Sequence, residues 1–488
     1  MKKKSLIIGS GIAGIAAAIR LAMKGYEVDV FEANSYPGGK LSEITLGAYR
    51  FDAGPSLFTL PEQVDELFRL AGRNPCDFFE YEKLDVTCRY FWEDGTRLKA
   101  YSDLNGFAEE VQTKLGESAS AIREALRQSA FIYDSLAPLF MNRSLHKLDT
   151  WTNPHALKSY LRMGKLGIFS TMNEANQRQF SHPKVVQLFN RYATYNGSNP
   201  FETPATLNII PHLEFNIGAY FPKNGMHDIT LSLFRLSKEL GVTYHFGQRV
   251  AQVLTENGNV KGIKVNGKEI HADLVVNNMD MVNSYKTILK DLKQPGFLLN
   301  QPKSSSALIF YWGIRRHFPE LDLHNIFFSD NYALEFEHIF KRGTIYEDPT
   351  IYLNITSTHK PDDAPEGCMN WFTMINVPNN QGQDWDDLIA VAKRNVIHKL
   401  NRILKTDVES LIEVEEILDP RTIEFKTSSA QGALYGNSSN NKFAAFLRHA
   451  NYSSSIKNLY FCGGSVHPGG GIPLCLLSAK IMSEMIEG

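Results

Sequence analysis

The sequence feature that most constrains the fold is a glycine-rich turn near the amino terminus, Gly9-Ser10-Gly11-Ile12-Ala13-Gly14. The apolar residues 5–8 before it are typical of a short buried strand, and the alanine-rich residues 15–24 after it predict a helix. Residues 27–31 alternate like a second strand, which leads directly into Glu32. This order of strand, glycine turn, helix, strand and acidic residue predicts a Rossmann-like unit that binds a dinucleotide.

The spacing of this motif gives each of its residues a physical role. The first glycine permits a tight turn, the second lets a pyrophosphate approach the backbone, and the third lets the helix pack closely on the strand. The amino terminus of the helix stabilises phosphate charge, and the acid after the second strand can accept hydrogen bonds from ribose hydroxyls. The predicted nucleotide contacts are therefore Gly9, Gly11, Ile12, Ala13, Gly14 and Glu32.

The composition limits the classes of protein to which the chain can belong. Its 488 residues are enough for two or three domains, and its formal net charge of −2 excludes the basic surplus of a dedicated nucleic-acid binder. The 5 cysteines are scattered without a CxxC pair, and the histidines show no metal-ligand spacing. We therefore predict neither a disulfide framework nor a metal site, and the cysteine content fits a reducing cytoplasm.

The amino terminus imitates a signal peptide in part. A basic start, Lys2-Lys3-Lys4, precedes an apolar run from Leu6 to Ile19, but glycines interrupt that run and no small-residue cleavage site follows. No later apolar stretch reaches about 18 residues, the length that predicts a membrane-spanning helix. We therefore expect a cytoplasmic protein without a transmembrane helix.

Three further motifs carry a family resemblance. Gly38-Gly39-Lys40 follows the acid, and Phe51-Asp52-Ala53-Gly54-Pro55-Ser56 comes soon after it. Near the carboxyl end, a strand that leads into Gly463-Gly464-Ser465 is followed by His467-Pro468-Gly469-Gly470-Gly471-Ile472-Pro473 and a predicted helix over 474–486. These motifs resemble the FAD-dependent amine oxidase and phytoene desaturase superfamily. The terminal segment looks most like the phytoene desaturase type of carotenoid desaturase, in its hydroxycarotenoid 3,4-desaturase branch.

The resemblance covers nearly the whole chain and implies an α/β fold with a Rossmann-like FAD-binding domain assembled from three separated segments. Residues 1–85, 221–290 and 420–488 would form this domain. Residues 86–220 with 291–419 would form an inserted α+β domain that binds the substrate and faces the membrane. The flavin contacts implied in the same way are Gly39, Lys40, Ser56, Leu57, the backbone of Val250, Asn278, Gly464, Gly471 and Ile472.

The implied chemistry is desaturation of a long apolar polyene, an acyclic carotenoid with or without a terminal hydroxyl group. Such a carbon chain offers no acidic proton, so the flavin must accept a hydride, and a proton is then lost to a group that the sequence does not identify. His467 is a weak candidate for a catalytic base, and the alternative is that it only fixes the glycine loop by hydrogen bonding. The flavin would be reoxidised by oxygen or a membrane quinone.

Two other functions are compatible with these motifs. One is a flavin amine oxidase that acts on a polar amine. The other is a prenyl-lipid escort protein that has the same fold but performs no redox chemistry. The fold alone does not decide among the three functions.

The segment 143–178 suggests contact with a membrane surface. At helical spacing, Leu157, Leu161, Gly164 and Ile168 share one face, and Lys158, Arg162 and Lys165 share another. This pattern is typical of a helix that lies in the membrane interface with its cations against anionic lipid, and equally of a solvated basic face on an ordinary helix. On the first interpretation, we predict peripheral membrane association.

Overall fold

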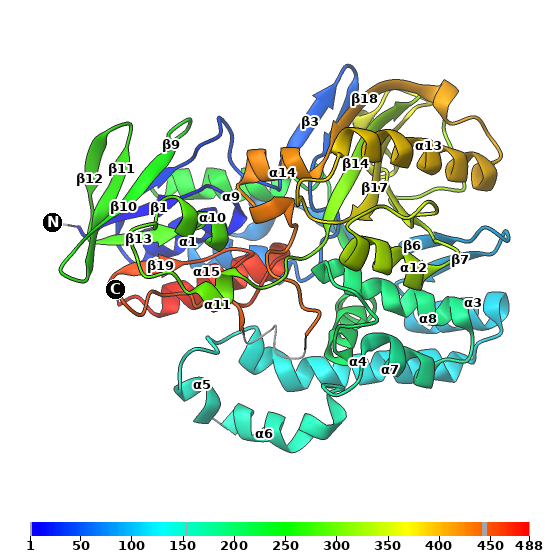
Figure 1. The fold of residues 1–488 in the computed structure, drawn as a ribbon, viewed down its shortest axis with the longest axis horizontal. Coiled ribbons are helices and arrows are strands. Elements are labelled where there is room, and N and C mark those ends of the chain that lie inside the picture. Colours follow the sequence, from blue (N-terminus) through cyan, green and yellow to red (C-terminus); the bar gives the residue numbers. More distant parts are fainter. Residues whose placement is uncertain (1, 153, 442–446, 488) are drawn as a thin grey trace.

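The computed structural model describes residues 2–152, 154–441 and 447–487, and two large sheets organise it (Figure 1). The first has five strands in the order β19-β13-β1-β2-β9, and all neighbouring pairs are parallel. These strands are β1 (Lys4–Ile8), β2 (Glu27–Phe31), β9 (Thr243–His245), β13 (Leu274–Asn277) and β19 (Leu459–Phe461). They come from three distant parts of the chain, so the predicted Rossmann-like α/β fold is confirmed. The exact domain boundaries stay a prediction.

Both faces of this parallel sheet are covered, as expected for strands that are apolar on both sides. On one face, Ile7 and Val30 pack with α1 (Ile12–Met23), α9 (Asp228–Glu239) and α15 (Ile472–Glu484). On the other face, Leu6 and Ile8 pack with a three-stranded sheet of β10 (Val250–Glu256), β11 (Asn259–Val265) and β12 (Lys268–His271). The hairpin turns of this small sheet lie at Asn257-Gly258 and Asn266-Gly267, where all residues have positive φ.

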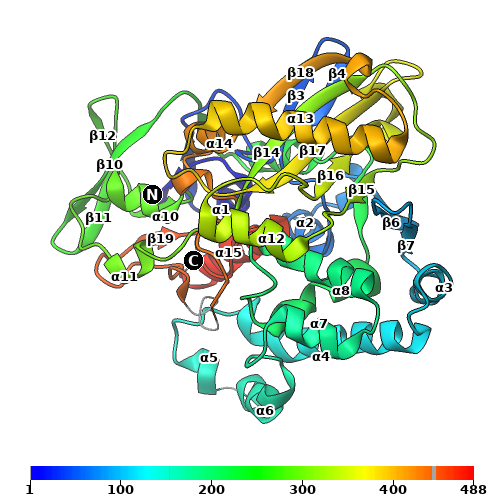
Figure 2. The same ribbon diagram turned by 45° about the vertical axis from the view of Figure 1, so that its right-hand side comes forward.

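The second large sheet has seven strands in the order β18-β14-β17-β16-β15-β6-β7. Only β15 and β6 run parallel among its neighbouring pairs in the described residues. One face packs against α13 (Trp385–Leu404), which crosses the sheet in Figure 2. The strands are β6 (Val86–Phe91), β7 (Arg97–Tyr101), β14 (Ser306–Ile314), β15 (His324–Phe327), β16 (Ile351–Asn354), β17 (Met369–Val377) and β18 (Ile412–Leu418).

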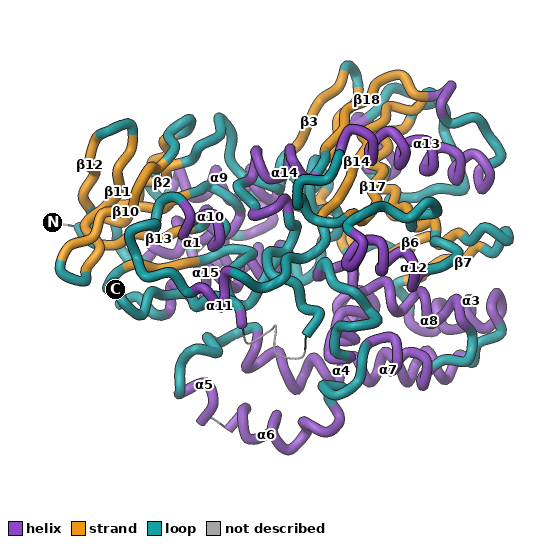
Figure 3. Tube along the Cα trace, in the orientation of Figure 1, coloured by secondary structure: helices purple, strands orange, loops and turns teal. Residues whose placement is uncertain are grey.

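A mainly helical layer adjoins the β6–β7 edge of this sheet. It contains α3 (Leu104–Leu115), α4 (Ala119–Phe140), α7 (Met172–Gln179) and α8 (Pro183–Asn190). Figure 3 shows the strands in two groups, with this helical layer below the right-hand group. The short helices α5 (Asp149–Thr152) and α6 (Pro154–Arg162) lie at the rim of the molecule beside α4 (Figures 1 and 2).

The remaining elements connect these layers. They are β3 (Glu43–Leu46), β4 (Tyr49–Asp52), α2 (Glu62–Leu70), β5 (Tyr81–Lys83), β8 (Tyr220–Pro222), α10 (Met281–Lys286), α11 (Gly296–Leu299), α12 (Tyr332–Glu337) and α14 (Pro420–Thr427). Among the described residues, no helix has both the length and the apolar character needed to cross a bilayer.

The amphipathic helix predicted to continue to Ile168 is shorter than expected. α6 ends at Arg162, a 3-10 turn covers Met163–Lys165, and Leu166 is buried. The helix cannot continue through Gly167, because that residue has a φ of +71°. The expectation that Ile168 shares an outer face with Leu161 is therefore wrong, and Ile168 lines an internal cavity instead. The side chains of Leu157 and Lys158 lie outside the described part of the structure.

We predict that Gly14→Ala destabilises the fold. A Cβ atom at this position would lie 2.1 Å from the carbonyl oxygen of Gly9 and 2.7 Å from Asn278 Nδ2, so α1 would have to move away from β1. Such overpacking costs about 1–3 kcal/mol, and we expect a lower midpoint of thermal unfolding by circular dichroism. Gly164→Ala is the matched control, because no described atom outside its chain neighbours lies within 4 Å of its added Cβ. An unchanged midpoint for Gly14→Ala would contradict the close packing of α1 on β1.

Candidate functional site

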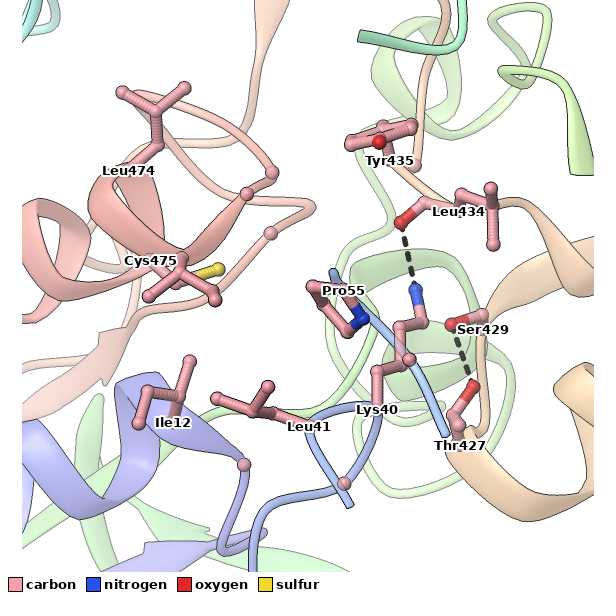
Figure 4. A pocket seen from close by; sticks show the side chains of 18 of the residues that line it. Ile12, Lys40, Leu41, Pro55, Thr427, Ser429, Leu434, Tyr435, Leu474 and Cys475 are labelled. Carbon is pink, nitrogen blue, oxygen red and sulfur yellow. Dashed lines mark hydrogen bonds between the residues drawn. The ribbon is translucent and has the colours of Figure 1, made fainter. Parts of the chain in front are cut away.

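A cavity of ≈ 1270 Å³ is bordered by both large sheets and by the helical layer. Small-molecule sites typically have volumes of about 300–1,000 Å³, so this cavity has room for a large ligand or for two ligands together. Figure 4 shows part of it, in which Leu474 and Cys475 of α15 face Lys40 and Leu434 across the space. All the predicted flavin contacts except Gly14 line this cavity.

At one end of the cavity, α1 presents its amino terminus. Gly11 is the N-cap residue and offers no side chain to the N–H groups of the first turn, while Ile12 and Ala13 line the cavity. Unpaired N–H groups at the positive end of a helix dipole bind anions such as a diphosphate. Gly9, with a φ of +93°, and Gly39 line the same end. The backbone at this end therefore suits the pyrophosphate for which the sequence motif predicts a site.

Glu32 is buried and holds the glycine turn in place. Its Oε2 accepts hydrogen bonds from the backbone N–H of Ser10 at 2.8 Å and from Ser10 Oγ at 2.9 Å. Its Oε1 accepts from the backbone N–H of Asn34 at 2.8 Å. A carboxylate can accept about four hydrogen bonds, so Glu32 keeps capacity for a ribose hydroxyl at the cavity wall.

Lys40 is a fixed charge inside the cavity wall. Its Nζ donates to the carbonyl oxygen of Leu434 at 2.8 Å, drawn in Figure 4, and to that of Ala433 at 3.3 Å. Burial lowers the pKa of Lys40, and the carboxylate of Asp280 partly offsets this effect. The contact of Lys40 with a flavin stays a prediction, but its place in the cavity lining shows that it is not an ordinary surface charge.

Asn278 joins the glycine turn to the two strands beside it. It follows β13, and its Nδ2 donates to the carbonyl oxygen of Gly9 at 3.3 Å. A Cβ at Gly11 would lie 3.1 Å from the same Nδ2, and a Cβ at Gly463 would lie 2.6 Å from Asn278 Oδ1. Val250 begins β10 and also lines the cavity, while its backbone contact with the adenine stays a prediction.

The second helix amino terminus at the cavity belongs to α15. Gly471 is its N-cap residue, with a φ of +106° and no side chain for capping, and Gly464 and Ile472 line the cavity beside it. Cys475 lies one turn into the helix and also lines the cavity. Burial raises the pKa of its thiol to about 11, although the positive charges of Lys40 and Arg448 partly offset this effect. The thiol is therefore protonated near neutral pH.

His467 lies outside the cavity lining and is fully buried. Its Nε2 is 2.8 Å from the carbonyl oxygen of Arg143, to which it donates. Burial is the main reason that its pKa is lowered to about 4. This environment favours the interpretation that His467 fixes the glycine loop over the interpretation that it is a catalytic base.

One face of the seven-stranded sheet forms a wall of the cavity. Side chains alternate along a strand, so every second residue points into the cavity while those between, such as Phe310 and Trp312, pack towards α13. The wall residues are largely apolar. They include Ala307, Ile309 and Tyr311 of β14, Phe372, Met374 and Asn376 of β17, Tyr352 of β16, and His324 and Ile326 of β15.

The opposite wall comes from the helical layer and is more strongly apolar. Leu136, Phe140 and Met141 from the end of α4 line it. Ile168 and a second group, Leu207, Ile209, Ile210 and Leu213, complete this part of the wall. A long hydrocarbon would be accommodated between these walls with little loss of hydrogen bonding.

Some polar residues of the cavity lining are hydrogen-bonded to one another. Ser56 Oγ lies 2.7 Å from the hydroxyl of Tyr352, which is 2.7 Å from His324 Nδ1. Burial lowers the pKa of His324 to about 3, so its ring is neutral. Arg191, which also lines the cavity, pairs with the buried Glu214. Among the described residues, His324 Nε2 and Arg191 Nε have no hydrogen-bond partner.

Sequence reasoning missed several of these wall residues. Arg448, Tyr435, Tyr332 and Arg191 line the cavity. Tyr435 stands in the segment Gly432-Ala433-Leu434-Tyr435-Gly436, which shares in the family resemblance but gives this residue no role, and the other three stand in segments without a motif. Their positions depend on contacts between distant segments, such as Arg448 Nη1 with the carbonyl oxygens of Tyr435 and Gly464, both at 3.2 Å. No local spacing in the sequence identifies such residues.

The lining as a whole fits FAD. An elongated dinucleotide needs a pyrophosphate seat, a ribose partner and a flat surface for the ring, and the cavity offers the start of α1, Glu32 and the glycine turn before α15. Two cations, the partly exposed Lys40 and the buried Arg448, also line it and suit an anionic ligand. No group of residues in the described ranges has the composition of a metal site.

Comparisons with known proteins agree with this geometry. The family model of flavin containing amine oxidoreductases matches residues 12–308. The chain is 52% identical to the 1-hydroxycarotenoid 3,4-desaturase of Flavobacterium sp. strain P99-3, over 99% of each chain. It is 31% identical to the 4,4'-diapolycopene oxygenase of Methylomonas sp., over 99% of this chain and 98% of that protein. Among solved structures, cyclohexylamine oxidase from Brevibacterium oxydans superposes with a TM-score of 0.64 at 13% identity and covers 100% of both chains.

We predict that His467→Gln leaves FAD binding intact and makes folding less sensitive to acid. The glutamine amide can donate to the carbonyl oxygen of Arg143 without titrating. Because burial lowers the pKa of His467 in the folded state to about 4 from 6.5, the unfolded chain binds the additional proton between these values. Stability is therefore lost as the pH falls from 6.5 to 4.

The measurement is the free energy of unfolding at pH 7, 6, 5 and 4 for the wild type and the variant. The variant should lose less stability over this window. An equal loss of stability in both proteins would contradict the lowered pKa of His467. A loss of FAD binding at pH 7 in the variant would contradict a purely structural role for this residue.

Proposed function

Since the chain belongs to the flavin containing amine oxidoreductase family and is a flavin-dependent oxidoreductase with FAD as its cofactor, we propose that it desaturates an acyclic, hydroxylated carotenoid at the 3,4 position. The observation that carries this proposal is the continuity of the cavity. One space joins the nucleotide-binding end at Gly11 and Glu32 to an apolar channel bounded by Phe140 and Met374. The 52% identity to a 1-hydroxycarotenoid 3,4-desaturase supports the choice of bond and substrate.

The protein residues contribute position and exclusion of water. FAD, when bound, accepts a hydride from the carbon chain. The apolar walls hold the polyene by burial of its hydrocarbon surface and keep water from the reacting carbon. The start of α15 directs N–H groups and a positive dipole end into the same cavity. We propose oxygen or a quinone as the acceptor that reoxidises the flavin.

One residue on the cavity wall favours a substrate with a hydroxylated end. Tyr332 of α12 lines the cavity and is 8% exposed. Its hydroxyl group makes no hydrogen bond to any residue that the structure describes. Tyr332 Oη is not among the fully buried atoms without a partner, so it is accessible to a ligand. A hydrocarbon chain has no group that could form a hydrogen bond with it. A terminal hydroxyl on the substrate would provide this partner.

The test is a substrate panel with the FAD-loaded protein under anaerobic conditions. We expect a hydroxylated acyclic carotenoid to bleach the flavin and to give a product that mass spectrometry shows to have lost two hydrogen atoms. Tyr332→Phe should lower kcat/KM for the hydroxylated substrate by about 5- to 10-fold, the value of one neutral hydrogen bond. It should leave kcat/KM for the non-hydroxylated analogue unchanged.

Other outcomes of the panel would identify the alternatives. Bleaching by primary amines and not by carotenoids would mean a flavin amine oxidase. Tight binding of polyenes with no bleaching would mean an escort protein. A product that gained oxygen in air would mean an oxygenase, the activity named for the Methylomonas relative.

We also propose that the protein docks on a membrane through the exposed apolar side chains of residues 148–169, here called the apolar patch: Leu148, Tyr160, Leu161, Met163 and Phe169. Leu148, Leu161 and Phe169 are 86%, 82% and 76% exposed, unusually high values for large apolar side chains. Exposed cations, Lys147 and Lys165, stand beside the patch in sequence. Ile168, next to Phe169, lines the cavity, so a lipid-soluble substrate could enter from the bilayer near this patch.

The cations do not all face solvent as the sequence suggested. Arg162 Nη1 donates to Ser135 Oγ at 3.2 Å, and its guanidinium lies 5.1 Å from the centre of the Phe131 ring. Its side chain therefore turns towards α4, and substituting it would disturb the helix packing as well as the surface charge.

We predict that the triple substitution Leu148→Ser, Leu161→Ser and Phe169→Ser reduces binding to phosphatidylglycerol vesicles by about tenfold or more. Full burial of even one such side chain contributes about 1.5–3 kcal/mol, which already corresponds to at least tenfold. Binding is measured as the protein fraction that sediments with the vesicles. Phe425→Ser is the matched control, since Phe425 is 82% exposed on α14, away from the patch. Equal sedimentation of wild type and triple variant would remove the patch from the proposal.

A further inference from the structure

Arg448 is a buried cation whose surroundings call for an anion. Its side chain is only 4% exposed and lines the cavity. Its Nη1 donates to the carbonyl oxygens of Tyr435 and Gly464, both at 3.2 Å, and its Nη2 donates to Asn196 Oδ1 at 3.4 Å. All three acceptors are neutral and all three bonds are long. Burial lowers the pKa of Arg448 to about 10, and the side chain is still charged near neutral pH.

The other buried arginines in the described residues have carboxylate partners. Arg20 pairs with Glu66, and Arg191 pairs with Glu214 at 3.3 Å. Arg448 has no carboxylate within ion-pair distance in the part of the chain that the structure describes. The stretch 442–446 just before it contains neither Asp nor Glu. A buried charge without a counter-ion is costly, and Arg448 lines the cavity, so an anionic group of a bound ligand there would balance its charge.

The position of Arg448 limits which part of the ligand this is. It contacts Gly464 and lies against Gly469, where an added Cβ would be 3.1 Å from the guanidinium carbon. Both glycines belong to the turn that leads to the start of α15. Cys475 lies one turn into α15, and the positive charges of Lys40 and Arg448 both act to lower the pKa of its thiol. The predicted pyrophosphate seat is at the start of a different helix, α1.

We propose that Arg448 stabilises the negative charge that the flavin ring acquires when it accepts a hydride. A hydride carries two electrons and one proton, so the neutral oxidised ring becomes an anion on reduction. In a water-excluded cavity, a fixed guanidinium lowers the free energy of that anion without reorganisation. Arg448 thereby makes the bound flavin a stronger oxidant for a hydrocarbon, which gives up a hydride reluctantly. This role does not depend on the identity of the proposed substrate, because the flavin ring gains the same negative charge from any hydride donor.

The test uses sulfite, which adds to an oxidised flavin and leaves the same negative charge on the ring. It requires no polyene, so its result is independent of the proposed desaturase activity. In the FAD-loaded protein, we expect Arg448→Met and Arg448→Gln to weaken sulfite binding, measured by flavin bleaching, by about 10- to 100-fold. This is the range for loss of one charge-assisted contact. Arg448→Lys should keep most of the affinity, and FAD binding measured by fluorescence should change little in all variants.

Arg315→Met is the matched control, because it removes a mostly exposed guanidinium that is not part of the cavity lining. Unchanged sulfite affinity in both neutral Arg448 variants would show that the residue only ties carbonyl groups together, and would overturn the proposal. Loss of FAD from both neutral variants, with FAD retained by Arg448→Lys, would mean that the positive charge of Arg448 binds the diphosphate of FAD. That result would also overturn the proposal. A sulfite effect of equal size in Arg315→Met would reduce the result to a general effect of net charge.

Discussion

The close packing of the backbone around Asn278 is the interaction on which the rest of the structure depends. Asn278 follows β13, donates to Gly9 after β1, and sits where a side chain on Gly463 after β19 would collide with it. Three segments that are hundreds of residues apart thus meet at one amide side chain. Because each neighbour is a glycine, the strand ends and the start of α1 approach closely enough to form one edge of the cavity. The same contact sets the position of the glycine turn before α15 relative to the glycine turn before α1.

The cavity built on this edge has two chemically different halves. The half near α1 and α15 offers backbone N–H groups, Glu32 and the two cations Lys40 and Arg448, which suit a charged dinucleotide. The half between the seven-stranded sheet and α4 offers apolar side chains, which suit a hydrocarbon. Each half is built from segments that are distant in the sequence, because Arg448 also contacts Asn196 and Ser56 contacts Tyr352. The two sets of groups therefore hold a cofactor and a substrate in one water-poor space.

The sequence predicted those parts of the fold that depend on local pattern. The βαβ unit, both Asn-Gly hairpins and the strand, turn and helix at the carboxyl end follow from spacing and glycine content, and the structure contains them. The sequence could not separate channel from core within β14, because all nine of its residues are buried and both faces are apolar. Only the packing of α13 on one face leaves Tyr311 in the cavity and Trp312 in the core. The end of α6 was missed for a local reason. Glycine adopts positive and negative φ about equally well, so the sequence alone does not show that Gly167 has a positive φ and ends the helical path.

The unequal distribution of charge between the two halves is consistent with hydride removal from a polyene. Hydride transfer separates charge: the flavin ring gains a negative charge, and the hydrocarbon is left electron-deficient. Conjugation spreads the positive charge over many carbon atoms, so it needs no specific partner, whereas the negative charge stays on one ring and benefits from a fixed cation. A wall of residues such as Ile309, Phe372 and Met374 beside the substrate, with Arg448 and Lys40 near α15, fits that difference. An enzyme that acts on polar amines would instead need polar residues on the substrate side of the cavity, because a charged substrate requires polar partners there.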